Sequence, residues 1–148
     1  MYETYTGHGI RFRYPSDWQF KERQSESEAS FLVASPETSF WSLTLFFEQP
    51  SPDDVLESAL DAFCEEYDEL DIYTVDATPL FPDCLARDLE FVCLELINSA
   101  FLRVIPTKRF TVFVFYQATD HELKQTRSVL EGISKTLQCD FGDDVITD

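Results

Sequence analysis

The amino-acid sequence predicts an α+β domain in which a mostly antiparallel sheet is sandwiched between helices in three layers. Segments with the apolar patterns of strands outnumber the two segments with the spacing of amphipathic helices. Short turns join several of the strand segments, as is typical of antiparallel hairpins. In addition, residues 85–97 and 109–117 are apolar on both faces, which indicates strands at the centre of a sheet that is covered on both sides.

The length of 148 residues is that of one domain. Residues 1–139 are predicted to form this domain, since no repeat, linker or low-complexity stretch interrupts them. Residues 140–148 carry four acids among nine residues and are predicted to form an acidic, flexible tail.

The first strands are expected to form a hairpin. Residues 10–14 alternate in polarity, Pro15-Ser16-Asp17 supplies a turn, and residues 18–23 resume the alternation. One face of the hairpin is predicted to be buried, with the side chains of Ile10, Phe12, Tyr14, Trp18 and Phe20. The other face is predicted to carry four basic side chains together, those of Arg11, Arg13, Lys21 and Arg23.

Further strands are expected at residues 30–34, 41–48 and 72–77, ahead of the long strand at residues 85–97. Residues 101–105 and the turn Pro106-Thr107-Lys108 are predicted to form a hairpin with the strand at residues 109–117.

The first helix is expected to begin at Pro52, with Ser51 as its N-cap and Asp54 reaching back toward the cap. Its apolar stripe, which is predicted to face a core, consists of Leu56, Leu60, Phe63, Tyr67 and Leu70. The second helix is expected after Thr119, because Glu122 completes the spacing of a capping box. Its apolar stripe consists of Leu123, Leu130, Ile133 and Leu137.

Ten side chains from these elements are predicted to be buried. They are Phe12, Tyr14, Trp18, Leu60, Phe63, Leu89, Phe91, Val112, Val114 and Leu130. The four cysteines form no CxxC pair and have no histidine at metal-binding spacing, so buried, reduced thiols are expected. Cys64 is placed on the apolar face of the first helix and Cys93 in a strand. No metal and no other cofactor is predicted.

The charge balance restricts the partners of this chain. With 28 acidic and 11 basic residues, the net charge of −17 excludes binding to nucleic acid or to an anionic membrane. No apolar segment is long enough to span a bilayer. The first residues lack the basic and apolar regions of a signal peptide, so a cytoplasmic location is expected.

The acidic residues are concentrated in the middle of the chain, since residues 24–86 contain 15 acids and neither lysine nor arginine. In the first helix they form an i,i+4 ladder, consisting of Asp53, Glu57, Asp61, Glu65 and Glu69. Like charges at this spacing oppose helix formation by about 0.2–0.5 kcal/mol per pair. Helix stability therefore does not explain the ladder, and two interpretations remain: a solvated face, or a surface for a basic partner or divalent cations.

One segment resembles a known family. Residues 12–18, Phe-Arg-Tyr-Pro-Ser-Asp-Trp, are similar to the opening motif of the PsbP-like superfamily, and the order of elements over residues 5–138 resembles that of its members. The resemblance implies a mostly antiparallel sheet between helices, in a bacterial member of unknown function. Such a protein is related in fold to photosystem II subunit P and to a nuclear-import factor that binds Ran. The motif itself implies no activity, because Pro15 ends a strand, Asp17 suits a turn and Trp18 fills a core.

The leading hypothesis is a non-enzymatic binding or assembly module that recognises a basic protein partner or a second copy of itself. Its predicted interaction residues are Asp61, Glu65, Asp68 and Glu69, together with the basic residues Arg11, Arg13, Lys21 and Arg23. One alternative is a chaperone for a secreted protein.

The other alternative is a small hydrolase-like enzyme, with a site assembled from scattered residues such as His121, Cys84 and Asp120. No nucleophile elbow, dinucleotide loop or phosphate loop is present in the sequence. His121-Glu122 begins like a zinc-binding HExxH motif, but residue 125 is glutamine, and His121 is predicted to be an exposed residue in the first turn of the helix. The missing motifs favour the non-enzymatic hypothesis.

Overall fold

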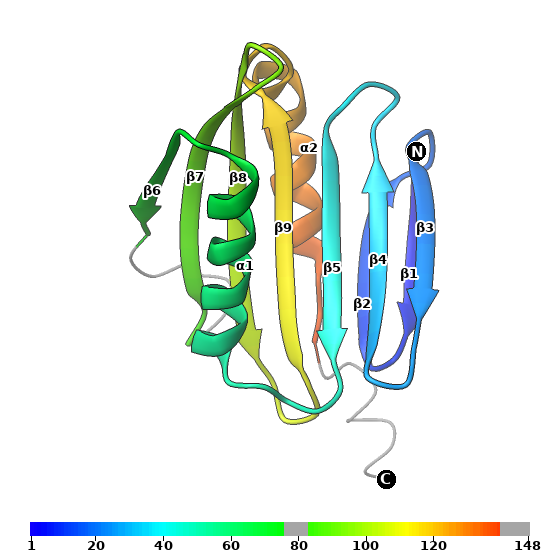
Figure 1. The fold of residues 1–148 in the computed structure, drawn as a ribbon. Helices are drawn as coiled ribbons and strands as arrows, with labels where there is room; N and C mark the ends of the chain where they lie inside the picture. Colours follow the sequence, from blue (N-terminus) through cyan, green and yellow to red (C-terminus); the bar gives the residue numbers. More distant parts are fainter. Residues whose placement is uncertain (76–82, 140–148) are drawn as a thin grey trace, which may run out of the picture.

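A seven-stranded antiparallel sheet organises the computed structural model, which describes residues 1–75 and 83–139 (Figure 1). The strand order is β3-β4-β5-β9-β8-β7-β6. The strands of this sheet are β3 (Gln19–Gln24), β4 (Glu28–Ala34), β5 (Phe40–Phe46), β6 (Leu70–Thr74), β7 (Leu85–Cys93), β8 (Leu96–Pro106) and β9 (Thr111–Thr119). A separate two-stranded ribbon consists of β1 (Tyr2–Gly7) and β2 (Ile10–Pro15).

The sheet is covered on both faces. Helix α1 (Pro52–Glu66) lies on one face, while helix α2 (Asp120–Thr136) and the β1–β2 ribbon lie on the other (Figure 1). We refer to these as the α1 face and the α2 face. This arrangement confirms the predicted α+β class with its mostly antiparallel sheet between helices.

Two apolar cores result, one on each face of the sheet. Successive side chains of β9 point to opposite faces of the sheet and so contribute to both cores. Val112 and Val114 belong to the α2-face core, whereas Phe113 and Phe115 pack into the α1-face core. Strand β9 lies in the middle of the sheet, as its apolar pattern predicted. Of the ten side chains predicted to be buried, six are buried and the other four are half-buried, namely Tyr14, Trp18, Leu60 and Phe63.

The predicted first hairpin is wrong in its pairing. Strand β2 pairs with β1 and not with β3, which pairs with β4 instead. The β1–β2 turn consists of His8 and Gly9, both with positive φ (53° and 83°), which is the conformation of a tight type I′ turn. Because β2 already has this partner, the segment after Pro15 crosses from the ribbon to the large sheet.

The predicted strand at residues 85–97 is interrupted by a turn. Leu94 and Glu95 adopt positive φ (53° and 65°) and separate β7 from β8, which pair as a hairpin. Neither residue is glycine, asparagine or aspartate, so the sequence carries no turn signal at this point. The predicted hairpin between residues 101–105 and 109–117 is confirmed, as β8 and β9.

The turn offers a stability prediction. The double variant L94N/E95G is expected to raise the free energy of unfolding by about 1–2 kcal/mol, because it removes two strained left-handed residues. Urea denaturation measures the change. The control L94S/E95S removes the same two side chains but keeps the strained backbone, so equal stability of the two variants would contradict the prediction.

The helix boundaries also differ in part from expectation. Helix α1 ends at Glu66, Tyr67 is extended, and Leu70 begins β6, so the apolar stripe does not continue to Leu70. Ser51 occupies the N-cap position without a side-chain capping hydrogen bond. Cys64 is exposed and not buried as predicted, because it lies on the outer side of α1.

Candidate functional site

The acidic ladder of α1 is exposed, as its spacing predicted. Asp53, Glu57, Asp61 and Glu65 project away from the buried side of the helix. Asp68 and Glu69 are also exposed but lie in the connection from α1 to β6, so the ladder does not extend to Glu69 as a helical residue. We call these six residues the acidic face. None of them forms an ion pair with another residue in the ranges 1–75 and 83–139.

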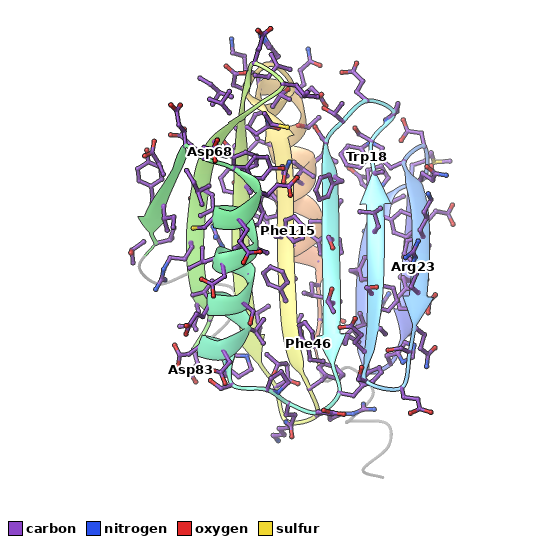
Figure 2. The ribbon with its side chains drawn as sticks, in the orientation of Figure 1. Trp18, Arg23, Phe46, Asp68, Asp83 and Phe115 are labelled. Carbon is purple, nitrogen blue, oxygen red and sulfur yellow. The ribbon has the colours of Figure 1, made fainter. Side chains whose placement is uncertain are left out.

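Helix α1 covers only part of the α1 face of the sheet. Helix α1 contacts β8 and β7, whereas β4 and β5 lie beyond it on the same face (Figure 1). A groove of about 460 Å³ runs between helix and sheet, lined by Phe46 and Phe113 from the strands and by Val55 and Ala59 from α1. Figure 2 shows Phe46 and Phe115 on this face. Helix α1 therefore borders a largely apolar groove. The acidic residue that lines it is Asp54, whereas none of the six residues of the acidic face does so.

The four predicted basic residues do not form one surface. Phe20 packs into the α2-face core, so alternation along β3 directs Lys21 and Arg23 to the α1 face, at the far edge of the sheet from α1 (Figure 2). The ribbon instead buries Ile10 and Phe12 against the α2 face and exposes Arg11 and Arg13 on its outer side. The shared face was predicted from the β2–β3 hairpin, and it is lost because that hairpin does not form.

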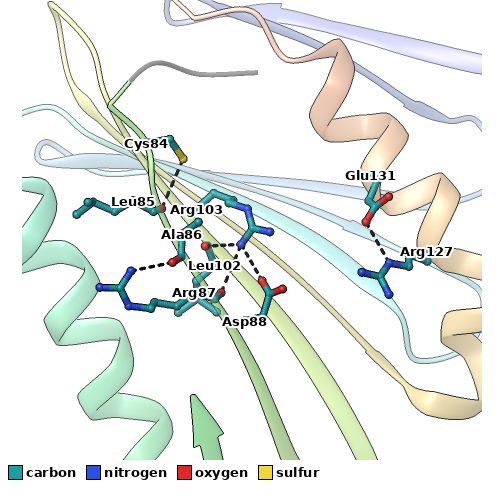
Figure 3. A network of polar contacts seen from close by, with 9 residues as sticks. All are labelled: Cys84, Leu85, Ala86, Arg87, Asp88, Leu102, Arg103, Arg127 and Glu131. Atoms are coloured by element: carbon teal, nitrogen blue, oxygen red, sulfur yellow. Dashed lines mark hydrogen bonds and ion pairs between the residues drawn. The ribbon is translucent and has the colours of Figure 1, made fainter. Parts of the chain in front are cut away.

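A second group of polar side chains lies on the α2 face, where β7 and β6 extend beyond α2. Arg103 Nη1 donates a hydrogen bond of 2.9 Å to Asp88 Oδ1, and Arg127 Nε donates one of 3.1 Å to Glu131 Oε2 on α2 (Figure 3). The Tyr73 hydroxyl donates to Glu90 Oε1 at 3.0 Å. A groove of about 290 Å³ separates this part of the sheet from α2.

Strand register brings this second group together. Tyr73, Asp88, Phe101 and Tyr116 form one row across β6, β7, β8 and β9. Burial raises the pKa of Tyr116 to about 12, so its phenol is neutral at physiological pH. The hydrogen bond to Glu90 raises the pKa of Tyr73. No motif in the sequence identifies this group, because its members are far apart in the chain and only the pairing of the strands aligns them.

Glu122 connects the start of α2 to the turn between β4 and β5. Thr119 caps the helix as predicted, by accepting a hydrogen bond from the Glu122 amide. The Glu122 carboxylate does not complete the capping box. It accepts hydrogen bonds from the amides and hydroxyls of Thr38 and Ser39. Partial burial acts to raise the pKa of Glu122, but these hydrogen bonds together lower it.

The structure does not bring the predicted catalytic residues together. His121 is exposed in the first turn of α2, as expected, and Asp120 precedes it. Cys84 directly precedes β7, whose first residue pairs with Val104 of β8. Helix α2 directly follows β9, whose last residue pairs with Asn98 of β8. Val104 and Asn98 are six positions apart on β8, which corresponds to about 20 Å along the strand. His121, Cys84 and Asp120 therefore do not form a catalytic site.

Two further findings concern the described residues. No helix among them is long and apolar enough to cross a bilayer. Over the same residues, no group of three histidine, cysteine, aspartate or glutamate side chains is arranged to hold a metal ion.

Solved structures share this architecture, in which a large antiparallel sheet carries one helix on each face. The solution structure of the cyanobacterial PsbP protein, CyanoP, from Synechocystis sp. PCC 6803 superposes with a TM-score of 0.61 at 13% identity, over 93% of this chain and 92% of that one. The chain therefore has the PsbP-like fold, in agreement with the motif at residues 12–18.

Two further structures have the same fold. LpqN of Mycobacterium tuberculosis, described as involved in cell envelope biogenesis, matches with a TM-score of 0.50 at 12% identity, over 93% of this chain and 90% of LpqN. A protein from Bacteroides thetaiotaomicron matches with a TM-score of 0.57 at 18% identity, over 88% of this chain but only 45% of the Bacteroides chain. No family model and no curated protein sequence matches the chain.

Proposed function

We propose that this protein is a non-enzymatic binding module that recognises a basic, amphipathic segment of a protein partner. The acidic face receives the basic side chains, and the groove between α1 and the sheet receives the apolar ones. The observation that carries the proposal is that α1 exposes carboxylates without an ion-pair partner in the described residues and also forms one wall of an apolar groove of about 460 Å³, which Asp54 lines at the start of the helix.

The charges on this face also set the orientation of the partner. Lys21 and Arg23 lie on the edge strand β3, across the open half of the sheet from α1. A basic segment is attracted by α1 and repelled by β3, so its basic side is held toward the helix. Exposed ion pairs contribute only about 0–1 kcal/mol each, but a cluster of them steers association and makes it sensitive to salt.

Labelled model peptides test the proposal. The first is an amphipathic helix of leucine and lysine, and the second has glutamate in place of lysine. We expect the lysine peptide alone to bind, more weakly at high salt, as measured by fluorescence anisotropy. The variant D61N/E65Q/D68N/E69Q is expected to bind it about tenfold more weakly, which corresponds to a loss of about 1.4 kcal/mol.

A matched control separates recognition from net charge. The variant E3Q/D17N/E26Q/E37Q removes four exposed acids elsewhere on the surface, so it changes the net charge equally. We expect it to lose less than twofold in affinity. Equal weakening of both variants would overturn the proposal, and so would a dimer, detected by size-exclusion chromatography, that excludes the peptide.

A further inference from the structure

The groove between α2 and the outer strands of the α2 face has a polar floor that the proposed function does not use. It lies on the opposite side of the sheet from the acidic face. Its volume of about 290 Å³ is near the lower end of the range for small-molecule pockets, about 300–1,000 Å³. Asp88, Glu90 and Ser99 line it from β7 and β8, and Arg127 lines it from α2.

Ser99 is the most informative of these residues. Its side chain lines the groove although the residue is only 9% exposed. Its hydroxyl forms no hydrogen bond with any residue of the ranges 1–75 and 83–139. Burial of a hydroxyl without a partner is unfavourable, so the Ser99 hydroxyl takes its hydrogen-bond partner from the groove, as water or as a ligand.

Two carboxylates present further acceptors beside this hydroxyl. Asp88 and Glu90 are two residues apart on β7 and face the same side, about 6.6 Å from each other along the strand. Asp88 Oδ1 accepts from Arg103 at 2.9 Å, and Glu90 Oε1 accepts from Tyr73 at 3.0 Å. The second oxygen of each carboxylate accepts no hydrogen bond from a described residue. Ser99 lies directly across from Glu90 in the β7–β8 register.

These three acceptors match the hydrogen-bonding capacity of a primary ammonium group, which has three donors and one positive charge. The opposite wall of the groove, formed by α2, carries a positive charge. Arg127 stacks on Phe101 at 5.1 Å and uses Nε to bind Glu131, so its two terminal nitrogens have no hydrogen-bond partner among the described residues. A guanidinium of this kind binds a carboxylate through paired hydrogen bonds.

We propose that this groove binds a small zwitterionic amine, with its ammonium group held by Asp88, Glu90 and Ser99 and its carboxylate held by Arg127. The ligand class is that of amino acids. Both charges of the ligand are needed, because the carboxylates that line the groove lie on β7 and the guanidinium that lines it lies on α2.

A homologous series of ω-amino acids tests this inference: 3-aminopropanoate, 4-aminobutanoate and 5-aminopentanoate. The series varies the spacing of the two charges, while butylamine and butanoate each lack one of them. By isothermal titration calorimetry, we expect the best member of the series to bind at least tenfold more tightly than either single-charge compound. Equal affinity for butylamine would overturn the proposal, because an acidic surface alone then explains the binding.

Variants assign the binding to individual groups. S99A and E90Q are each expected to weaken binding of the best ω-amino acid about tenfold, and R127Q is expected to do so without weakening that of butylamine. S99A is expected to be at least as stable as the wild type in urea, since it removes a buried hydroxyl that has no partner. The control E65Q, on the acidic face, is expected to bind normally. Unchanged binding in S99A and E90Q would overturn the proposal.

Discussion

The Trp41→Ala variant is expected to lose about 3–5 kcal/mol of its free energy of unfolding, the cost of removing a buried tryptophan side chain. Trp41 lies on β5, is 0% exposed, and is among the largest side chains of the α2-face core. Its ring packs against Phe12 of β2 with 5.0 Å between centroids, and its Nε1 donates a 2.9 Å hydrogen bond to Ser134 Oγ of α2. One side chain thus joins the sheet, the ribbon and the second helix.

Two further variants make this test specific. Trp41→Phe keeps most of the volume but leaves Ser134 without its donor, so a loss of about 1–2 kcal/mol is expected. Leu94→Ala, at a side chain that is 90% exposed, is expected to change stability by less than about 0.5 kcal/mol. Urea denaturation measures all three. A loss below about 1 kcal/mol in Trp41→Ala would contradict the central place of this residue in the core.

The Glu122→Ala variant is expected to lose about 2–3 kcal/mol, because hydrogen bonds to a charged group contribute more than neutral ones. The change leaves the amides and hydroxyls of Thr38 and Ser39 without their acceptor, and Ser39 is buried. The β4–β5 turn is then held less firmly to α2. Glu37→Gln, in the same turn but exposed, is the control and is expected to have little effect.

The same carboxylate predicts a pH dependence of stability. Its pKa is lower in the folded protein than its ordinary value of 4.5, so folding favours the charged form. This contribution is fully present above the pKa of the unfolded chain and is lost as the pH falls through the lower, folded-state pKa. Urea denaturation of wild type and Glu122→Gln across this range measures it. The difference between them is expected to shrink on acidification, and a difference that stays constant would contradict the assignment.

The sequence predicted best where local pattern and tertiary structure agree. Residues of β9 are apolar on both faces because the strand lies between two cores, and this environment is visible in the composition alone. Thr119 was recognised as a helix cap because capping depends on its immediate neighbours. In contrast, the pattern of residues 10–14 is that of any half-buried strand, and nothing in it identifies β1 as the partner.

The same distinction explains which part of the candidate sites was foreseen. Asp61 and Glu65 project from α1 because helical periodicity fixes their direction. The groove on the α2 face, in contrast, can be predicted only when the pairing of β7 with β8 is known, because this pairing places Ser99 across from Glu90. Its prediction also requires the position of Arg127 on α2. Sequence spacing does not predict these contacts. They join different strands and a helix, and the lengths of the connecting segments do not determine which residues of these elements lie opposite each other.

The pairing of β5 with β9 has a consequence for how the chain reaches its folded state. The two strands are neighbours in the middle of the sheet, yet their paired residues Phe46 and Thr111 are 65 positions apart in the chain. Closing so long a loop is entropically costly, and folds dominated by such distant contacts form slowly, in milliseconds to seconds. During synthesis on the ribosome, β3, β4 and β5 emerge well before β9 and expose the edge of β5 until it arrives. We therefore expect nascent chains that stop before residue 111 to be aggregation-prone, with this edge as the region that a chaperone protects.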